Sequence, residues 1–216
     1  MKPGSAANRD LIMLLGAWAL TLAWSGYAPA DRLTWLLEVA PALIAAAVLW
    51  ATRARYRPTT LLMMLVLVHG VILMVGGKYT YAHVPLGFWM QDWFGWSRND
   101  YDKIGHFAQG FVPAVAAREL LIRVFELRSR RLIAFLAVAI CLGISSAYEL
   151  IEWAAALAMG QGADEFLGTQ GNPWDTQEDM FMALVGAVVA LLTITRWHDR
   201  QIATLEAAHP AAGGAH

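Results

Sequence analysis

The chain has 216 residues, of which 58% are hydrophobic and only 15% are charged, and its mean hydropathy is +0.45. A soluble domain of this length cannot bury so much apolar surface, so the composition excludes an ordinary water-soluble protein and predicts an integral membrane protein. The formal net charge of -1 shows no basic excess, and we therefore expect no nucleic-acid partner. The single cysteine, Cys141, excludes an intramolecular disulfide and a cysteine-based metal site within this sequence.

A helix needs about 20 mostly apolar residues to cross about 30 Å of hydrocarbon, because each residue advances the axis by about 1.5 Å. Six stretches meet this requirement, roughly 11–27, 33–51, 60–77, 104–124, 132–158 and 176–197. The sequence therefore predicts an all-α fold, a polytopic membrane helix bundle of about six transmembrane helices in one membrane domain over residues 1–216. The first stretch is alternatively a cleavable signal peptide, since Lys2 and Arg9 precede it and Ala28-Pro29-Ala30 follows it.

Basic residues concentrate in alternate loops and indicate an orientation, because Lys and Arg mark the cytoplasmic loops of membrane proteins. One side of the predicted bundle holds Lys2, Arg9, Arg53, Arg55, Arg57, Arg123, Arg128, Arg130, Arg131, Arg196 and Arg200. The opposite loops are acidic and hold Asp31, Asp92, Asp100, Asp102, Asp164, Glu165 and Asp175. The sequence thus predicts a multi-pass protein of a bacterial inner (plasma) membrane with both termini in the cytoplasm.

The predicted outer loop, residues 78–103, is unusually aromatic. It contains Tyr79, Tyr81, Phe88, Trp89, Trp93, Phe94, Trp96 and Tyr101. Because aromatic side chains favour the membrane–water interface, we expect this segment to lie along the headgroup layer and anchor the fold. The alternative is a lid over a site that opens to the outer leaflet.

Ionisable residues from three predicted spans should reach a common depth near the outer face. His106 lies just inside the outer end of the fourth span, and Asp179 lies in the first turn of the sixth. Glu149 follows Leu132, at the inner end of the fifth span, by 17 residues, or about 25 Å of helix. Glu152 comes three residues later and shares its side of the helix. We expect these four side chains to converge.

Such groups are costly at membrane depth and face a bundle interior or a wet cavity, and carboxylates repel one another unless a proton, a histidinium or a metal ion lies among them. The four are therefore candidate catalytic acid–base groups and candidate ligands of a divalent metal ion such as Zn, Mn, Fe or hydrated Mg. A bound ion would activate water or polarise a phosphoryl group. The candidate supporting residues are Asp102, Lys103, Gln109 and Asp175.

Several of these residues also have purely structural interpretations. His106 is alternatively a polar clasp that donates a hydrogen bond to Glu149. Glu152 alternatively reaches the outer headgroups. Asp175, with Glu178 three residues later, resembles a capping box that opens the last span.

Other residues within the spans predict helix contacts. His69, near the midplane of the third span, should hydrogen-bond to a neighbouring helix, and Glu119, deep in the fourth, must find a partner. Small residues form a face on the sixth span and another on the fifth, which predicts a close approach of these two helices. The two faces consist of Ala183, Gly186, Ala187 and Ala190, and of Gly143, Ser145, Ser146 and Ala147.

Three strings in the second half of the chain are distinctive: Tyr101-Asp-Lys-Ile-Gly-His-Phe-Ala-Gln-Gly-Phe-Val-Pro113, Ser146-Ala-Tyr-Glu-Leu-Ile-Glu-Trp153 and Leu167-Gly-Thr-Gln-Gly-Asn-Pro-Trp-Asp-Thr-Gln-Glu-Asp-Met180. In these strings the chain resembles the YjdF-like inner-membrane proteins, and its first half is similar to them in its pattern of spans. More distantly it resembles the VanZ-like family, at Asp102, Lys103, His106, Phe107, Glu149, Glu152, Asp179 and Gly186, with Ala183 where that family usually has Asn. The resemblance implies an inner-membrane location and a six-span plan.

Three functions remain open on these residues. The first is an outer-leaflet site that binds or acts on a membrane lipid, a lipid-linked ligand or an envelope precursor. The second is a small proton-coupled transporter, although an inverted repeat is not apparent. The third is a non-catalytic membrane scaffold or helper, in which the polar cluster only joins three helices.

Overall fold

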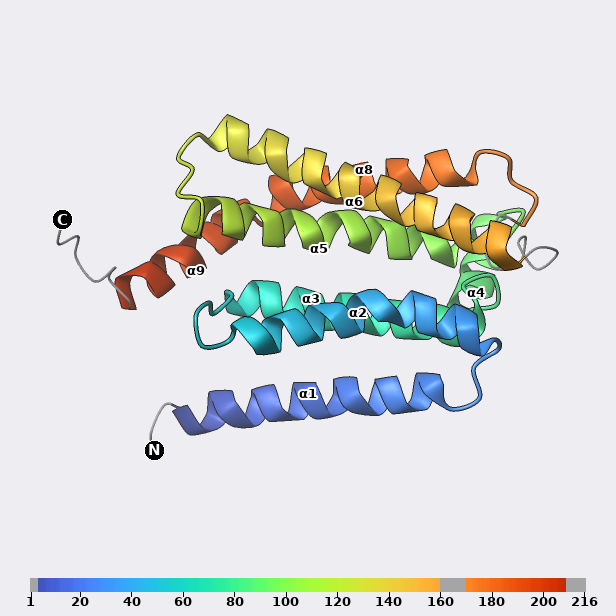
Figure 1. Cartoon of the computed structure of the whole chain (residues 1–216), viewed down its shortest axis with the longest axis horizontal. Coiled ribbons are helices and arrows are strands. Elements are labelled where there is room, and N and C mark those ends of the chain that lie inside the picture. Colours follow the sequence, from blue (N-terminus) through green and yellow to red (C-terminus); the bar gives the residue numbers. More distant parts are fainter. Residues whose placement is uncertain (1–3, 160–169, 209–216) are drawn as a thin grey trace.

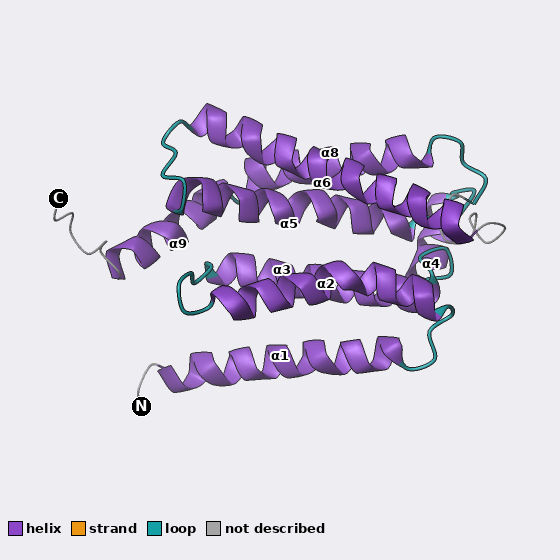
Figure 2. Ribbon diagram, in the orientation of Figure 1, coloured by secondary structure: helices purple, strands orange, loops and turns teal. Residues whose placement is uncertain are grey.

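A computed structural model describes residues 4–159 and 170–208, and within these ranges the chain is helical without strands (Figure 2). The helices are α1 (Gly4–Gly26), α2 (Arg32–Thr52), α3 (Thr60–Tyr79), α4 (Pro85–Phe94), α5 (Tyr101–Arg123), α6 (Arg130–Met159), α8 (Asp175–Thr193) and α9 (Thr195–Ala208). The prediction of an all-α fold is confirmed. By length and composition α2, α3, α6 and α8 are able to cross a membrane, whereas α5 is long enough but carries several charged residues.

The six long helices overlap the six stretches expected from the sequence, with two differences. The last stretch was expected to continue to Trp197, but α8 ends at Thr193 and α9 begins at Thr195. The second difference is α4, which forms inside the aromatic segment. Pro85 occupies its first turn, where a missing N–H is harmless, and Gly95 ends it in the left-handed conformation with φ 65°.

The long helices run alongside one another in three groups (Figure 1). α1 packs on α3, α2 also packs on α3, and α3 in turn contacts α5. α5 packs against both α6 and α8, and its contact with α8 is the most extensive between any two helices in the described ranges. α5 is therefore the central element, and it brings residues from both halves of the chain together.

The α5–α8 contact is close because both helices present glycine. A Cβ added at Gly110 would overlap the carbonyl oxygen of Ala183, and one added at Gly186 would overlap the carbonyl oxygen of Phe107. The small face of α8 thus packs on α5. The predicted approach of α6 and α8 holds in part: the two helices are in contact and Ser146 Oγ donates to Sδ of Met180 at 3.3 Å. The prediction is wrong at Gly143, whose added Cβ would have nothing within 4 Å. The spacing of small residues fixed the face of α8, but not which neighbour it meets.

The two ends of the bundle differ in charge. The start of α1, the loops 53–59 and 124–129, and α9 lie at one end, while α4 lies at the other (Figure 1). We call the first the arginine end, because its loops and adjoining helix termini hold Arg53, Arg55, Arg57, Arg123, Arg128, Arg130 and Arg131. The other is the acidic end, where α5 and α8 begin and α3 and α6 finish.

A buried polar network ties α9 to the bundle at the arginine end. Glu119, which is fully buried, accepts hydrogen bonds from Tyr56, Thr59, Arg123 and His198. The expectation that Glu119 must find a partner is confirmed. Arg118 Nη1 lies 3.0 Å from Nδ1 of His198. Because arginine can only donate, Nδ1 accepts and the Nε2–H of His198 donates to Glu119 at 2.9 Å.

Candidate functional site

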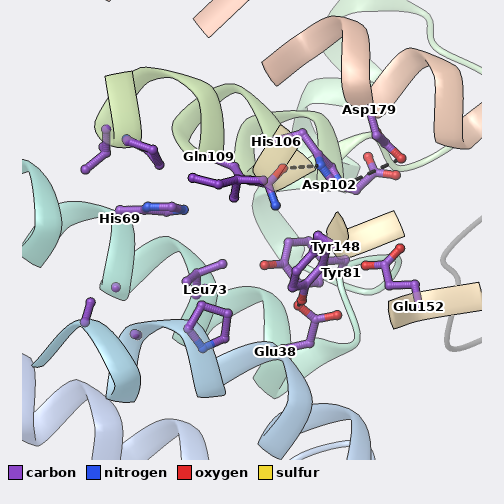
Figure 3. Close-up of a pocket in the computed structure, with 18 of the residues that line it drawn as sticks. Glu38, His69, Leu73, Tyr81, Asp102, His106, Gln109, Tyr148, Glu152 and Asp179 are labelled. Atoms are coloured by element: carbon purple, nitrogen blue, oxygen red, sulfur yellow. Dashed lines mark hydrogen bonds and ion pairs between the residues drawn. The ribbon is translucent and has the colours of Figure 1, made fainter. Parts of the chain in front are cut away.

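A cavity of about 300 Å³ lies between α2, α3, α5 and α6 and extends to α8 (Figure 3). Towards the acidic end its wall is polar and includes Glu38, Tyr81, His106, Tyr148, Glu152 and Asp179. Further along the helices the wall is apolar and includes Ala42, Ala45, Val66, Val112, Ala116 and Ile144. The volume is at the lower limit of ordinary small-molecule sites, which span about 300–1,000 Å³. The cavity therefore has one polar and one apolar half.

A strained turn places Tyr81 in this wall. α3 ends with Thr80 at φ 54° and Tyr81 at φ 51°, two consecutive non-glycine residues in the left-handed region. A Cβ at Gly76 would overlap the ring of Tyr81, and one at Gly105 would lie 3.0 Å from it. The ring thus occupies space that these two glycines leave open. Backbone strain of this kind is found most often at functional sites.

His106, Glu149 and Asp179 form the centre of the polar half. Nδ1 of His106 lies 3.8 Å from Oε1 of Glu149, and Nε2 lies 3.7 Å from Oδ2 of Asp179. The exposed fractions of the three residues are 9%, 8% and 4%. One ligand atom from each lies within 4.8 Å of the others. The structure thus brings together three of the four residues singled out from the sequence, each from a different helix.

These distances do not fit a simple clasp. Hydrogen bonds between nitrogen and oxygen span about 2.7–3.2 Å, so neither carboxylate is bonded to His106. The imidazole instead contacts Gln109, whose Oε1 lies 3.1 Å from Nδ1. Oε1 of Glu149 is buried and has no hydrogen-bond partner among the described residues. The three side chains therefore lie close together without forming hydrogen bonds to one another.

A second acidic set lies beside the first and forms ion pairs with basic residues. Asp102, Asp175 and Asp179 also bring carboxylate oxygens within 4.8 Å of one another. Arg98 pairs with Asp175 and lies 3.5 Å from Asp102, and Lys103 lies 3.4 Å from Asp179. Of the residues expected to support the site, Asp102, Lys103 and Asp175 belong to this set, whereas Gln109 orients His106.

Asp175 corrects a sequence-based interpretation. The N-cap of α8 is Trp174, which makes no side-chain cap, and Asp175 is the first residue of the helix. Its carboxylate binds Arg98 instead of closing a capping box with Glu178, and Glu178 binds Lys103 at 2.9 Å. The sequence spacing alone favoured a local cap, but Asp175 instead forms an ion pair with the partly buried guanidinium of Arg98.

Glu152 lies apart from the three-residue cluster, on the side of the cavity formed by α2. It is partly exposed, and Figure 3 shows it near Tyr81 and Tyr148. Across the cavity the Tyr148 hydroxyl donates to Oε2 of Glu38 at 2.9 Å, which joins α6 to α2. Sequence reasoning missed this contact. Glu38 is 5% exposed inside an apolar helix, and a carboxylate in such a helix indicates a buried polar contact. The sequence around Tyr81 and Tyr148 contains no comparable indication.

His69 behaves differently from the expectation. Its Nε2 atom is buried and has no hydrogen-bond partner among the described residues, so the predicted hydrogen bond to a neighbouring helix is wrong for that atom. The side chain lines the cavity between its polar and apolar halves (Figure 3). A buried, unsatisfied nitrogen in a cavity wall is available to a molecule that enters the cavity.

Fold and site together define a polytopic helical membrane protein with an acid- and histidine-lined cavity. The chain belongs to the family described as "Predicted membrane protein (DUF2238)", whose family model matches residues 11–200. It is 55% identical over 196 residues to the inner membrane protein YjdF of Escherichia coli (strain K12), an alignment that covers 90% of this chain and 94% of that protein. No solved structure matches the chain. The family and inner-membrane resemblance expected from the three sequence strings are confirmed.

Proposed function

We propose that this protein binds a membrane lipid or a lipid-linked envelope precursor, with its headgroup at the acidic end and its hydrocarbon in the apolar half of the cavity. The observation that carries the proposal is the division of one cavity into a polar and an apolar half. A water-soluble ligand gains nothing from a wall built of Ala45, Val112 and Ile144. A fully apolar ligand would leave the buried Nε2 of His69 in the cavity wall without a hydrogen-bond partner.

We infer that the cavity also opens towards lipid beside α6, because Ile144 lines it and is 41% exposed. On a transmembrane helix that exposed surface faces hydrocarbon, and an acyl or prenyl chain enters sideways without crossing water. Glu38 and Tyr148 join α2 and α6 nearer the acidic end. The opening is therefore placed for the tail of a ligand, and its headgroup lies beyond the Glu38–Tyr148 bond.

The proposed orientation puts the acidic end outside and the arginine end in the cytoplasm. It is supported by the positive-inside rule, since the loops at the arginine end carry Arg53, Arg55, Arg57 and Arg128. α4 supports it from the other side, because this short helix exposes Phe88, Trp89, Trp93 and Phe94 at 43%, 57%, 70% and 63%. Such a helix fits the outer headgroup layer. Of residues 78–103, Thr80, Tyr81 and Asp102 line the cavity and α4 contributes no lining residue, which favours an anchor over a lid.

A transport route is less well supported than a binding site. Between the polar half of the cavity and Glu119 lies a hydrophobic core that includes Leu62, Val115 and Cys141, against which Val66 and Ala116 of the cavity wall pack. Leu62 follows Thr59 by one turn and Val115 precedes Glu119 by one turn, so apolar packing separates the two polar regions. A scaffold role does not require a cavity. The imidazole and carboxylates are also groups that general acid–base catalysis uses, so lipid chemistry at the same site is compatible with binding.

Filling the apolar half tests the proposal. Ala45 lines the cavity, whereas Ala47, two residues later on α2, is exposed, so Ala45→Phe and Ala47→Phe form a matched pair. The probes are vesicles that contain diazirine-tailed phosphatidylethanolamine or phosphatidylglycerol, with cross-linked peptides mapped by mass spectrometry. We expect wild type and Ala47→Phe to cross-link on α2, α5 and α6, and Ala45→Phe to lose most of that signal. Equal labelling of the two variants would refute the proposal.

A further inference from the structure

We infer that His106, Glu149 and Asp179 bind one divalent cation, and that this cation receives the phosphate of the headgroup in the cavity. The part that concerns the headgroup rests on the proposed function, whereas the cation site stands on the geometry of the three side chains. The site joins α5, α6 and α8 at the acidic end. No separate aqueous channel to the cation site is needed, because Asp179 is part of the cavity wall.

The spacing of the three side chains fits one small ion. A tetrahedral ion with bonds of about 2.1 Å holds its ligand atoms about 3.4 Å apart. The ligand atoms here lie within 4.8 Å of one another, with a closest His106–Asp179 separation of 3.7 Å. Each atom would therefore move inward by less than about 1 Å. Side-chain torsions supply such a shift without moving the helices.

The second observation is an unsatisfied oxygen aimed at the cluster. Glu149 is 8% exposed, and its Oε1 lies 3.8 Å from the imidazole without any hydrogen bond among the described residues. Gln109 presents its Oε1 to Nδ1 of His106, so Nδ1 carries the proton and Nε2 turns a lone pair towards Asp179. Three electron-rich atoms thus lie close together, and the Glu149 oxygen among them has no donor among the described residues. A cation supplies what they lack, and Gln109 then acts as the outer partner that orients a ligating histidine.

The neighbouring acidic set is a poorer candidate. Arg98 and Lys103 already lie among Asp102, Asp175 and Asp179, so positive charge is supplied there by side chains. Among the described residues, Oε1 of Glu149 has no hydrogen-bond donor, and the imidazole of His106 lies 3.8 Å from it. The uncompensated carboxylate therefore belongs to the cluster with the imidazole. This contrast favours His106, Glu149 and Asp179 over the all-aspartate set.

The donor set also defines the ion and its task. One imidazole nitrogen and two carboxylates suit Zn²⁺, Mn²⁺ or Fe²⁺ and leave coordination positions open. Without an ion, the acidic wall repels the phosphate that most lipid headgroups carry. With a divalent ion, the charges of the two carboxylates are neutralised, and an open coordination position on the ion accepts a phosphate oxygen. The acidic character of the cavity thereby becomes compatible with a phospholipid.

The test uses the full chain in detergent with Mn²⁺ alone as the probe. We expect wild type to bind one Mn²⁺ per chain, with nitrogen modulation in pulsed electron paramagnetic resonance that reports a coordinated imidazole. His106→Gln should abolish that modulation, and Glu149→Gln or Asp179→Asn should weaken binding by at least about tenfold. Asp92→Asn is the matched control, because Asp92 is an exposed carboxylate of α4 at the same end, and its affinity should equal that of wild type.

Two results would overturn the inference: wild type that binds no Mn²⁺, or Mn²⁺ without nitrogen modulation. The spectroscopic readout needs only wild-type protein, so a variant that fails to fold does not leave the question undecided. If Ala45→Phe abolishes lipid cross-linking but a chelator does not change it, the inferred cation site is refuted and the proposed lipid binding stands. If wild type binds Mn²⁺ but Ala45→Phe leaves lipid cross-linking unchanged, the cation site stands and the proposed lipid binding is refuted.

Discussion

Gly110 offers a sharp test of how α5 and α8 assemble the site. It lies one turn after His106, and its contact Ala183 lies one turn after Asp179. In Gly110→Ala the new methyl group would overlap the carbonyl oxygen of Ala183, a backbone atom that cannot rotate away. Overpacking costs about 1–3 kcal/mol, and we expect the upper value because backbone opposes backbone. Alanine returns about 1 kcal/mol of helix propensity, which leaves a net destabilisation of about 2 kcal/mol.

Gly143→Ala is the matched control. Gly143 is also helical, but an added methyl group there meets nothing within 4 Å, so only the propensity gain remains. This variant should be more stable than wild type by about 0.5–1 kcal/mol. The assay is unfolding in detergent micelles titrated with dodecyl sulfate, followed by circular dichroism. Because Gly110→Ala also separates His106 from Asp179, its Mn²⁺ affinity should fall. Equal stability of the two variants would show that α5 and α8 do not pack through these glycines.

Two further predictions concern the network at the arginine end. Glu119→Gln should lower the free energy of unfolding by about 2–4 kcal/mol, because the amide NH₂ would face groups such as the Thr59 hydroxyl that donate to the carboxylate. The control Glu126→Gln, at an exposed position, should change it little. Equal midpoints of the two variants in dodecyl sulfate titration would contradict this prediction. Burial, and then the charge of Glu119, raise the pKa of Tyr56, which lies outside the spans. The stabilisation from its protonated hydroxyl is therefore complete below about pH 10 and lost as pH rises further, so stability measured from pH 9 to 11 should fall more steeply in wild type than in Tyr56→Phe. Parallel slopes would refute it.

The sequence predicted positions along the helices better than directions around them. Depth follows from a fixed rise per residue, so counting from Leu132 placed Glu149 at the level of His106 and Asp179, where the structure puts it. Which neighbour a side chain faces depends on packing, which spacing does not contain. For this reason Gly143 was assigned to a contact that it does not make.

Polar contacts between distant helices were the other limit. Asp175 was read through its local spacing to Glu178, while its actual partner, Arg98, lies 77 residues earlier. The bond between Tyr148 and Glu38 spans 110 residues. Such pairs depend on tertiary arrangement, and only the presence of a carboxylate in an apolar helix pointed to Glu38. The strained turn at Tyr81 likewise depends on Gly105 of another helix.

The network around Glu119 has a consequence for biosynthesis. Arg118 and Glu119 enter the bilayer with α5, yet His198 and Asp199, which bind them, are separated from Arg118 by 80 and 81 residues. A ribosome must therefore translate α6 and α8 before these partners emerge. A nascent chain arrested before α9 therefore holds Arg118 without the carboxylate of Asp199.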